Sequence, residues 1–289
     1  MNAAVKSYLS LFKFRICSLI TFSAIVGLMS ASSGNVSIVN IFFLTIATMM
    51  AASGASAFNH YFDMDIDAVM KRTRKRPIPS GIVNDSKMVL LAAILLVLGS
   101  VLVSCSLLNY MVGLHLFLGA FVYAIVYTAW LKRRRWTNII VGGLAGSFAV
   151  LAGGASVTPE FCLPPVLLAI VMFFWTPSHF WSFAIVHKEE YEKAGIPMLP
   201  NVIGDSKTAK YILLNTVILV ISSFLPSFFG SLGLLYTLTA VLAGVFFIGR
   251  NIQLLSDTSK EMAWKNFKAS MVYLAVLFMG VIGDVILLS

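Results

Sequence analysis

Nine long apolar runs dominate this chain of 289 residues and leave few folds open to it. A helix of about 20 apolar residues crosses the hydrocarbon core of a bilayer, and each run is long enough to do so. Because backbone polar groups in lipid must be bonded within the segment, we predict an all-α, polytopic membrane protein with nine transmembrane helices. The runs lie near 16–34, 38–59, 88–107, 110–130, 137–157, 163–187, 209–229, 232–250 and 269–288.

The positive charges fall on one side of these predicted helices. All 21 Lys and Arg residues lie in the N-terminal segment or around the connections after runs two, four, six and eight, and the other connections have none. Since cytoplasmic loops carry the excess of Lys and Arg, we expect a cytoplasmic N-terminus and an outside C-terminus. Topology and anionic lipid headgroups then account for the net charge of +9, and nucleic acid is not an expected partner. The long connections are cytoplasmic, so we expect the functional site there.

The segment 59–81 carries both signs of charge at a predicted membrane border, where charged side chains are costly and usually functional. Asn59, Asp63 and Asp67 are four residues apart and would share one face of a helix, with Asp65 pointing away. Two carboxylates at this spacing repel each other. A Mg²⁺ ion, which binds one or two carboxylates together with phosphate oxygens, would compensate them. A salt-bridge cluster with the basic residues that follow is the alternative.

A second acidic cluster follows the sixth apolar run, at Glu189 and Glu190. It lies four predicted helices after the first cluster and on the same side of the membrane. This arrangement indicates one transmembrane domain, residues 1–289, built from two related halves at about 1–130 and 131–289. Ordinary solvated loop charge, with Glu189 paired to a nearby lysine, is the alternative.

The sixth run has an unusual interior, with Pro177 and His179 among several aromatic residues. Pro177 removes one helical hydrogen bond and is expected to bend the helix and free a carbonyl. A histidine inside a membrane helix is a candidate ligand, and the aromatic rings suit an apolar substrate or a carbocation. A hydrogen-bonded structural histidine and simple aromatic packing are the alternatives. The basic run Lys132-Arg-Arg-Arg135 is interpreted as a membrane anchor or as part of a phosphate site.

These motifs resemble the UbiA superfamily of intramembrane prenyltransferases, and within it the haem O synthase branch. The superfamily pattern of Asn, then Asp four and eight residues later, is met by Asn59, Asp63 and Asp67. The similarity covers about residues 11–210, and Glu189 with Glu190 replaces the usual Asp pair. The further matching segments are Asp63-Met-Asp65-Ile-Asp67, Met70, Arg72-Thr73, Arg76-Pro77, Tyr127-Thr-Ala-Trp-Leu-Lys132, Gly142-Gly143, Thr176-Pro-Ser-His179-Phe-Trp181 and Gly195-Ile-Pro-Met-Leu-Pro200.

The resemblance implies a cytoplasmic-side cavity in which farnesyl diphosphate binds with Mg²⁺. It implies transfer of the farnesyl group to a vinyl group of haem b, with addition of water, to give haem O; haem is then a substrate and not a cofactor. The roles carried over are catalytic for Asp63, Asp67, Arg72 and Arg76; metal-binding for Asn59, Asp63, Asp67 and one of Glu189 and Glu190; diphosphate-binding for Arg72, Arg76 and Lys132; and haem contact for His179.

The expected partners are these two substrates and the bilayer of the cell membrane. Proteins that deliver or receive haem are possible further partners. Two other functions stay open. One is a prenyltransferase of the same superfamily whose acceptor is an aromatic ring or a glycerol lipid. The other is an ion-coupled transporter, which uses intramembrane acids and a broken helix. Against transport, the acids cluster at one membrane border instead of the midplane, and phosphate-type cations accompany them.

Overall fold

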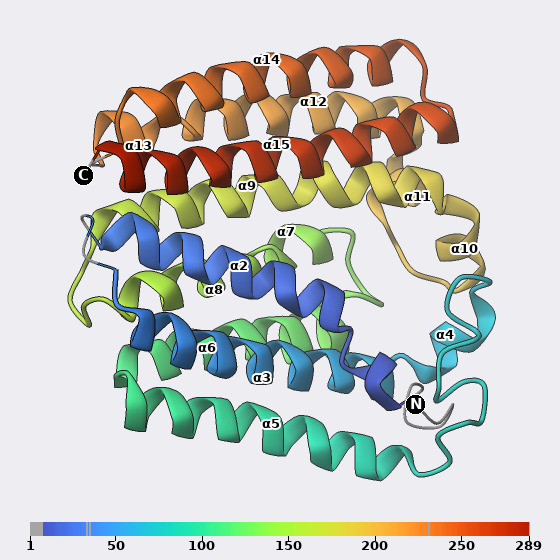
Figure 1. The fold of residues 1–289 in the computed structure, drawn as a ribbon. Helices are drawn as coiled ribbons and strands as arrows, with labels where there is room; N and C mark the ends of the chain where they lie inside the picture. The colour runs from blue at the N-terminus through green and yellow to red at the C-terminus, as the bar shows by residue number, and fades with distance from the viewer. Residues whose placement is uncertain (1–7, 33, 35, 231, 289) are drawn as a thin grey trace.

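A computed structural model of the chain describes residues 8–32, 34, 36–230 and 232–288. Within these residues there is no strand, and nine segments are long and apolar enough to cross a membrane, so the predicted all-α fold is confirmed. The segments run back and forth between the two ends of a bundle (Figure 1). They are α2 (Phe14–Ala31), α3 (Ile38–Phe62), α5 (Ser86–Leu107), α6 (Tyr110–Phe121) with η1 (Val122–Leu131), α7 (Asn138–Gly142) with α8 (Leu144–Ala155), α9 (Leu163–Val186), α12 (Asp205–Ser222) with α13 (Leu225–Phe228), α14 (Leu234–Ser256) and α15 (Lys260–Leu288).

Three short helices gather at one end of the bundle: α4 (Met64–Val69), α10 (Lys188–Lys193) and α11 (Leu199–Ile203) (Figure 1). Helix α4 follows α3 and carries the first acidic cluster, and α10 follows α9 and carries the second. The two segments meet, because the backbone N–H of Arg72 donates to Glu190 Oε2 at 3.2 Å. Both acidic clusters therefore lie at the same end, as predicted from their positions after runs two and six.

The last span begins earlier than predicted. Its apolar run suggests a start near 269, whereas α15 begins at Lys260. The first turns of α15 are polar, so hydropathy does not detect them. They are helical because Ser259 Oγ accepts from the backbone N–H of Met262 at 3.3 Å and Lys265 pairs with Glu261 at 2.7 Å, one turn apart.

Helices α2 and α8 cross at backbone contact distance. A Cβ atom at Gly153 would lie 1.8 Å from the carbonyl oxygen of Ala24, and a Cβ atom at Gly27 would lie 2.1 Å from that of Val150. Membrane helices gain little from the hydrophobic effect and are held together mainly by close packing, which small residues permit. These two glycines therefore set the position of α2 and of the cavity wall that α2 supplies.

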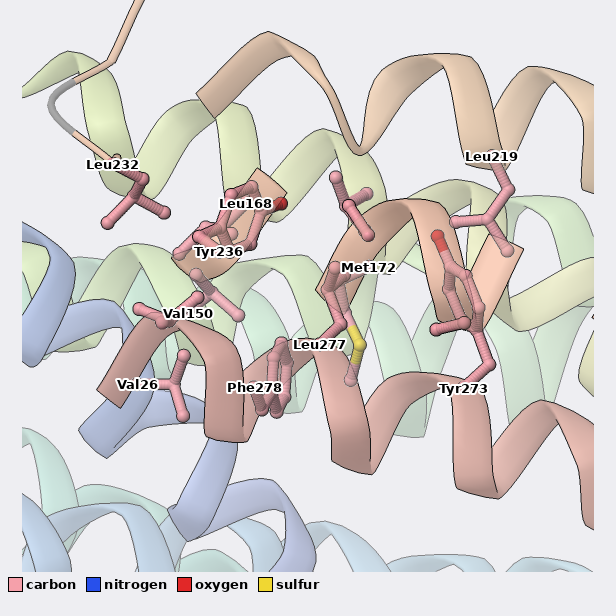
Figure 2. Packing of buried hydrophobic residues seen from close by; sticks show 14 of the residues in the cluster. Val26, Val150, Leu168, Met172, Leu219, Leu232, Tyr236, Tyr273, Leu277 and Phe278 are labelled. Atoms are coloured by element: carbon pink, nitrogen blue, oxygen red, sulfur yellow. The ribbon is translucent and has the colours of Figure 1, made fainter. Parts of the chain in front are cut away.

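The largest buried cluster lies between α9, α14 and α15, with single contributions from neighbouring helices (Figure 2). Its two large polar residues are satisfied inside the bundle. The hydroxyl of Tyr236 donates to the Ser223 carbonyl at 2.8 Å, and the Tyr273 hydroxyl is hydrogen-bonded to Ser223 Oγ. Since an unpaired polar group in lipid is costly, these bonds help to fix how the C-terminal helices pack.

Asp284, near the end of α15, has a structural role that its sequence position does not reveal. Its carboxylate accepts hydrogen bonds from the backbone N–H groups of Gly233 and Tyr236 at the start of α14. The first N–H groups of a helix have no partner within it and attract negative charge. Asp284 thus caps α14 from a neighbouring helix.

Helix α9 continues through Pro177. The carbonyl of Phe174, in the turn that the proline weakens, accepts from Asn215 Nδ2 on α12 at 2.6 Å. The same amide donates to Ser178 Oγ at 2.7 Å. Polar side chains of α12 therefore support α9 where its own hydrogen bonding is interrupted.

Candidate active site

A cavity of about 700 Å³ lies at the end of the bundle that carries α4 and α10. It is lined by segments that are far apart in the sequence and that the fold brings together. A second, apolar chamber of about 230 Å³ adjoins it and shares five wall residues with it, Lys13, Ile16, Tyr123, Gly142 and Thr176. The predicted site residues that line the larger cavity are Asn59, Asp67, Arg72, Arg76, Lys132 and His179.

Cationic side chains outnumber carboxylates on the wall of the larger cavity. Among the described residues that line it, one is a carboxylate, Asp67, and five are cationic: Lys13, Arg72, Lys75, Arg76 and Lys132. A concave surface with an excess of positive charge attracts anions. Arg in particular forms paired hydrogen bonds to phosphate oxygens.

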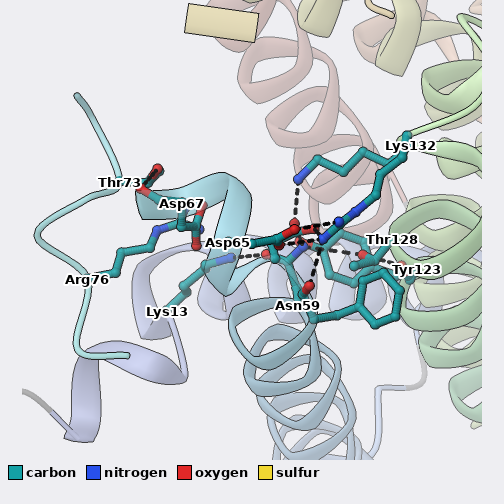
Figure 3. A network of polar contacts seen from close by, with 12 residues as sticks. Lys13, Asn59, Asp65, Asp67, Thr73, Arg76, Tyr123, Thr128 and Lys132 are labelled. Carbon is teal, nitrogen blue, oxygen red and sulfur yellow. Dashed lines mark hydrogen bonds and ion pairs between the residues drawn. The ribbon is translucent and has the colours of Figure 1, made fainter. Parts of the chain in front are cut away.

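Asp63 lies at the junction of α3 and α4 and is fully buried. Its Oδ2 atom accepts from Asn59 Nδ2 at 2.7 Å and forms an ion pair with Lys132; Figure 3 shows the side chains of Asn59 and Lys132 converging. Its Oδ1 atom has no hydrogen-bond partner among the described residues and lies 3.9 Å from the guanidinium of Arg133. A buried carboxylate oxygen without a hydrogen-bond partner is costly, and a bound cation is one group that could compensate it.

Asp67 is also buried and faces the cavity from α4. Arg76 donates to its Oδ2 atom at 2.6 Å, and the Thr73 hydroxyl donates to its backbone carbonyl at 3.0 Å (Figure 3). The turn after α4 is thereby folded back so that Arg76 lies beside the acid. This ion pair is one that the salt-bridge alternative predicts.

Asp65 faces away from the cavity, as the helical spacing predicts. Its side chain is 62% exposed and accepts two hydrogen bonds of 2.7 Å from Arg133. These bonds hold the pKa of the Asp65 carboxyl below its usual range and raise the pKa of Arg133. Asp65 and Arg133 therefore form a pair at the rim, separate from the buried acids.

Lys13 is a cavity residue that the sequence reasoning missed. It has a left-handed backbone (φ 45°) just before α2, an uncommon conformation for a residue other than glycine. Its Nζ donates to Asn59 Oδ1 at 2.9 Å (Figure 3). Burial, with the charges of Arg76 and Lys132, lowers the pKa of the Lys13 ammonium to about 7. A lone lysine near the start of the chain gives no signal of this contact.

One wall of the cavity is built by a π-helix, η1, whose hydrogen bonds link residues five apart. The backbone N–H of Lys132 donates to the Tyr127 carbonyl at 2.8 Å in this pattern, and the Thr128 hydroxyl donates to the Tyr123 carbonyl at 2.8 Å. The wider turn brings Tyr123, Tyr127 and Lys132 to one cavity wall. A π-helix is rare and is frequently found at a functional site, and no residue pattern predicted this one.

Glu189 and Glu190 point in different directions. Glu189 is exposed and accepts from Lys260 Nζ at 2.8 Å, which lowers the pKa of its carboxyl. Glu190 instead faces the other acidic segment, bonded to the backbone of Arg72 and 3.6 Å from the His187 ring. Neither is among the described residues that line the cavity.

The acids do not form a cage for a metal by themselves. Among the described residues, no three His, Cys, Asp or Glu side chains are grouped closely enough to hold an ion. Two buried carboxylates with an unpartnered oxygen at Asp63 nevertheless fit Mg²⁺, which often binds one or two carboxylates and completes its shell with water and substrate phosphate.

His179 reaches the cavity from α9, next to an aromatic wall. The His179 ring lies between those of Trp175 and Phe267, with centroids 4.2 and 4.4 Å away. Phe180 and Phe183 line the cavity beside it. This side of the cavity is therefore aromatic, with one imidazole ring among the phenyl rings.

The smaller chamber is lined mostly by apolar and small residues of α2, α3, α6, α8 and α9. Several wall positions are Ala or Gly, so the chamber is space that larger side chains would fill. Its polar contributors at the shared boundary are Lys13, Tyr123 and Thr176. An apolar chamber joined to a cationic mouth suits an amphiphile with an anionic head and a hydrocarbon tail.

The chain is similar over nearly its whole length to proteins of one family. A model of the UbiA prenyltransferase family matches residues 20–279. Protoheme IX farnesyltransferase 1 of Paramagnetospirillum magneticum is 47% identical over 279 residues, which are 96% of this chain and 98% of that protein. Protoheme IX farnesyltransferase 2 of the same organism is 42% identical over 287 residues, 99% of each. Protoheme IX farnesyltransferase of Granulibacter bethesdensis is 38% identical, covering 98% of this chain and 91% of that protein.

Solved structures share the fold at low sequence identity. A structure of digeranylgeranylglyceryl phosphate synthase superimposes with a TM-score of 0.81 at 22% identity, covering 99% of each chain. A UbiA homologue from Aeropyrum pernix K1 has a TM-score of 0.73 at 17% identity, covering 92% of this chain and 98% of that one. A UbiA homologue from Archaeoglobus fulgidus bound to DMAPP and Mg²⁺ has a TM-score of 0.63 at 15% identity, covering 94% and 99%.

Proposed function

The chain belongs to the UbiA prenyltransferase family, and from this premise we propose that it transfers the farnesyl group of farnesyl diphosphate to a vinyl group of haem b. The C–O bond to diphosphate breaks, a C–C bond to the vinyl group forms, and water adds with loss of a proton to give haem O. Relatives named protoheme IX farnesyltransferase, 38–47% identical over almost the full chain, support this choice of substrates.

One observation carries the proposal: the cation-lined cavity continues into an apolar chamber through shared walls. The diphosphate would lie among Lys13, Arg72, Arg76 and Lys132, and the farnesyl chain would enter the chamber. The aromatic side of the larger cavity is then left for the acceptor. Two separate apolar regions around one anion site suit the transfer of a prenyl group between two hydrophobic substrates.

We further propose that Asp63 and Asp67 hold Mg²⁺ against the diphosphate, with Asn59 positioning Asp63. The bound ion would stabilise the negative charge that develops as diphosphate leaves. The unpartnered Oδ1 atom of Asp63 supports this assignment. So does the Archaeoglobus fulgidus homologue solved with DMAPP and Mg²⁺. Glu190 is a better candidate for a second ion than Glu189, which is paired with Lys260 in solvent.

Arginine and lysine side chains would supply the rest of the electrostatic stabilisation. Arg76 is held by Asp67 and Lys132 by Asp63, so both cations are placed before substrate arrives. Preorganised charges aimed at developing negative charge are usually the largest contribution to catalysis. Arg72, held over the Phe183 ring at 5.1 Å, adds a third cation at the boundary between the diphosphate and acceptor regions.

The allylic cation left by diphosphate would be protected by aromatic walls. Tyr123 lies in the wall shared by the larger cavity and the apolar chamber, Tyr127 lines the larger cavity, and the faces of both rings attract positive charge. His179, on the far aromatic wall, is our candidate for haem contact. Water must reach only the haem side after the new C–C bond has formed, since earlier contact would give farnesol.

For the whole molecule we propose a cell-membrane protein with its site, N-terminus and basic connections in the cytoplasm and its C-terminus outside. The segregation of Lys and Arg supports this orientation. We also propose that the domain consists of two related halves, about 1–130 and 131–289. In support, α3 and α9 each lead into a short acidic helix, and the two segments meet at the bond between Arg72 and Glu190.

An acceptor competition tests the reaction. Purified protein would be given farnesyl diphosphate and Mg²⁺ with equal amounts of haem b, an aromatic acid and a glycerol lipid phosphate, with an EDTA control. We expect a farnesylated product from haem alone, and none with EDTA. A product from either other acceptor in place of haem would keep the fold and the donor site but overturn the proposed acceptor.

A further inference from the structure

His179 is held by a hydroxyl group that cannot itself reach a substrate. Its Nδ1 atom lies 2.7 Å from Ser270 Oγ on α15. Ser270 is fully buried, with no exposed surface, whereas His179 lines the larger cavity. Any influence of Ser270 on a bound molecule must therefore act through the histidine.

The direction of this hydrogen bond follows from the second partner of Ser270. A serine hydroxyl has a single hydrogen, and that of Ser270 is donated to the Phe267 carbonyl at 2.6 Å. Ser270 Oγ is then left to accept, so the proton between the two side chains belongs to His179 Nδ1. Nδ1 therefore carries a proton, and in the neutral imidazole this leaves the lone pair on Nε2.

The orientation of the ring is fixed as well as its tautomer. Trp175 stacks on the His179 ring with an angle of 21° between the planes, and Phe267 covers the other face at 30°. The indole N–H of Trp175 donates to the Ser270 carbonyl at 2.7 Å. Ser270 thus bonds His179 with its hydroxyl and the stacked tryptophan with its carbonyl.

Nε2 is free to bind a ligand. No described residue hydrogen-bonds this atom, although the other ring nitrogen is fully engaged. The surrounding wall is aromatic, since Phe183 and Trp264 lie 5.2 and 5.0 Å from the Phe267 ring centroid. A neutral imidazole whose far nitrogen donates a hydrogen bond is the usual form of a metal-ligating histidine.

We propose that Ser270 is a positioning residue that presents His179 Nε2 as an axial ligand to the iron of the acceptor haem. This inference rests on the proposed function, because it takes haem b as the acceptor. Ligation at one point, on an aromatic wall, would fix the position of the iron and the plane of the macrocycle relative to the diphosphate region.

The test is the spectrum and affinity of haem b bound to the full-length protein without farnesyl diphosphate. Wild-type protein should give a histidine-ligated spectrum, with an iron–histidine stretch in resonance Raman of the ferrous form. His179→Ala should lose that stretch. Ser270→Ala should keep the fold but weaken haem binding by about tenfold to a hundredfold and shift the stretch, as loss of an outer hydrogen-bond partner does. Ser270→Thr, which keeps the hydroxyl, should restore both.

A matched control is Ser104→Ala. Ser104 is also fully buried, and its hydroxyl donates to the Ser100 carbonyl in its own helix at 2.8 Å. It should leave the haem spectrum unchanged, which separates a positioning effect from general loss of packing. Because His179→Ala is read from the spectrum alone, it remains informative even where Ser270→Ala lowers the yield of folded protein.

Two outcomes would overturn the inference. If wild-type protein farnesylates haem but Ser270→Ala and His179→Ala leave its affinity and spectrum unchanged, the inference fails and the proposed function stands. If wild-type protein neither binds nor farnesylates haem, while it transfers farnesyl to another acceptor, both fail.

Discussion

Lys13 and Asn59 are hydrogen-bonded, Nζ to Oδ1 at 2.9 Å, although 46 residues separate them in the chain. The bond ties the segment before α2 to the acidic cluster at the end of α3. Asn59 also donates to Asp63. The side chains of Lys13, Asn59 and Asp63 therefore form one chain of hydrogen bonds. A cation brought in from the N-terminal segment thus belongs to the site as much as those of the 59–81 segment do.

Lys13 is expected to make diphosphate binding depend on pH. With a pKa of about 7, its ammonium is present below that pH and is lost as the pH rises through it. Binding of farnesyl diphosphate, measured at equilibrium, should weaken by about tenfold between about pH 6 and about pH 9, the value of one charge-assisted hydrogen bond. Lys13→Arg stays charged and should flatten the profile. An equal slope in both proteins would show that another group is responsible.

The three aspartates should differ sharply in their effect on turnover. Asp63→Asn and Asp67→Asn each remove a proposed metal ligand and should lower kcat by at least about a hundredfold, since metal stabilisation of a leaving group is worth several kcal/mol. Asp65→Asn is the matched control, because it removes the same charge from the exposed rim. Steady-state kinetics at saturating Mg²⁺ measures all three. Equal losses would support a general salt-bridge cluster instead of a metal site.

The apolar chamber should set the length of the prenyl chain. Ala52→Phe would fill part of it, so transfer from farnesyl diphosphate should fall by about tenfold or more while the short dimethylallyl donor is kept. Ala275→Phe adds the same ring on the exposed face of α15 and should change neither rate. The ratio of the two donor rates is the measurement. An unchanged ratio in Ala52→Phe would place the chain elsewhere.

Close packing of α2 on α8 should make Gly153 intolerant of a side chain. A Cβ atom there would lie 1.8 Å from a backbone carbonyl oxygen, so Gly153→Ala should lower the thermal midpoint in detergent and cost at least about 1–3 kcal/mol. Gly249→Ala is the control, because a Cβ atom at Gly249 meets nothing within 4 Å. Similar midpoints for the two variants would contradict the close crossing.

The helical spans could be predicted from the sequence because membrane insertion depends on local hydrophobicity, which a single run displays. The start of α15 was missed for the same reason, since its polar first turns are helical without being apolar. The cap that Asp284 supplies to α14 also could not be predicted from the sequence. It joins residues about fifty positions apart, and only the packing of α14 on α15 brings them together.

At the site, residue spacing predicted which side chains share a helix face. It did not predict which residues far apart in the chain are in contact. The four-residue spacing predicted that Asp63 and Asp67 share one face and that Asp65 points away from it; in the structure the first two are buried and Asp65 is exposed. Nothing in the spacing distinguishes Glu189 from Glu190, which differ only through Lys260 on α15 and the backbone of Arg72. Lys13 and the π-helix η1 likewise depend on tertiary packing, so the sequence gives no sign of them.

The most direct test of the account is mass spectrometry of haem after wild-type protein is incubated with haem b, farnesyl diphosphate and Mg²⁺ in ¹⁸O-labelled water. We expect a haem product heavier by one farnesyl group and one molecule of water that carries the label, formed only when metal is present. Unmodified haem alongside released diphosphate and a farnesylated molecule of another kind would contradict it.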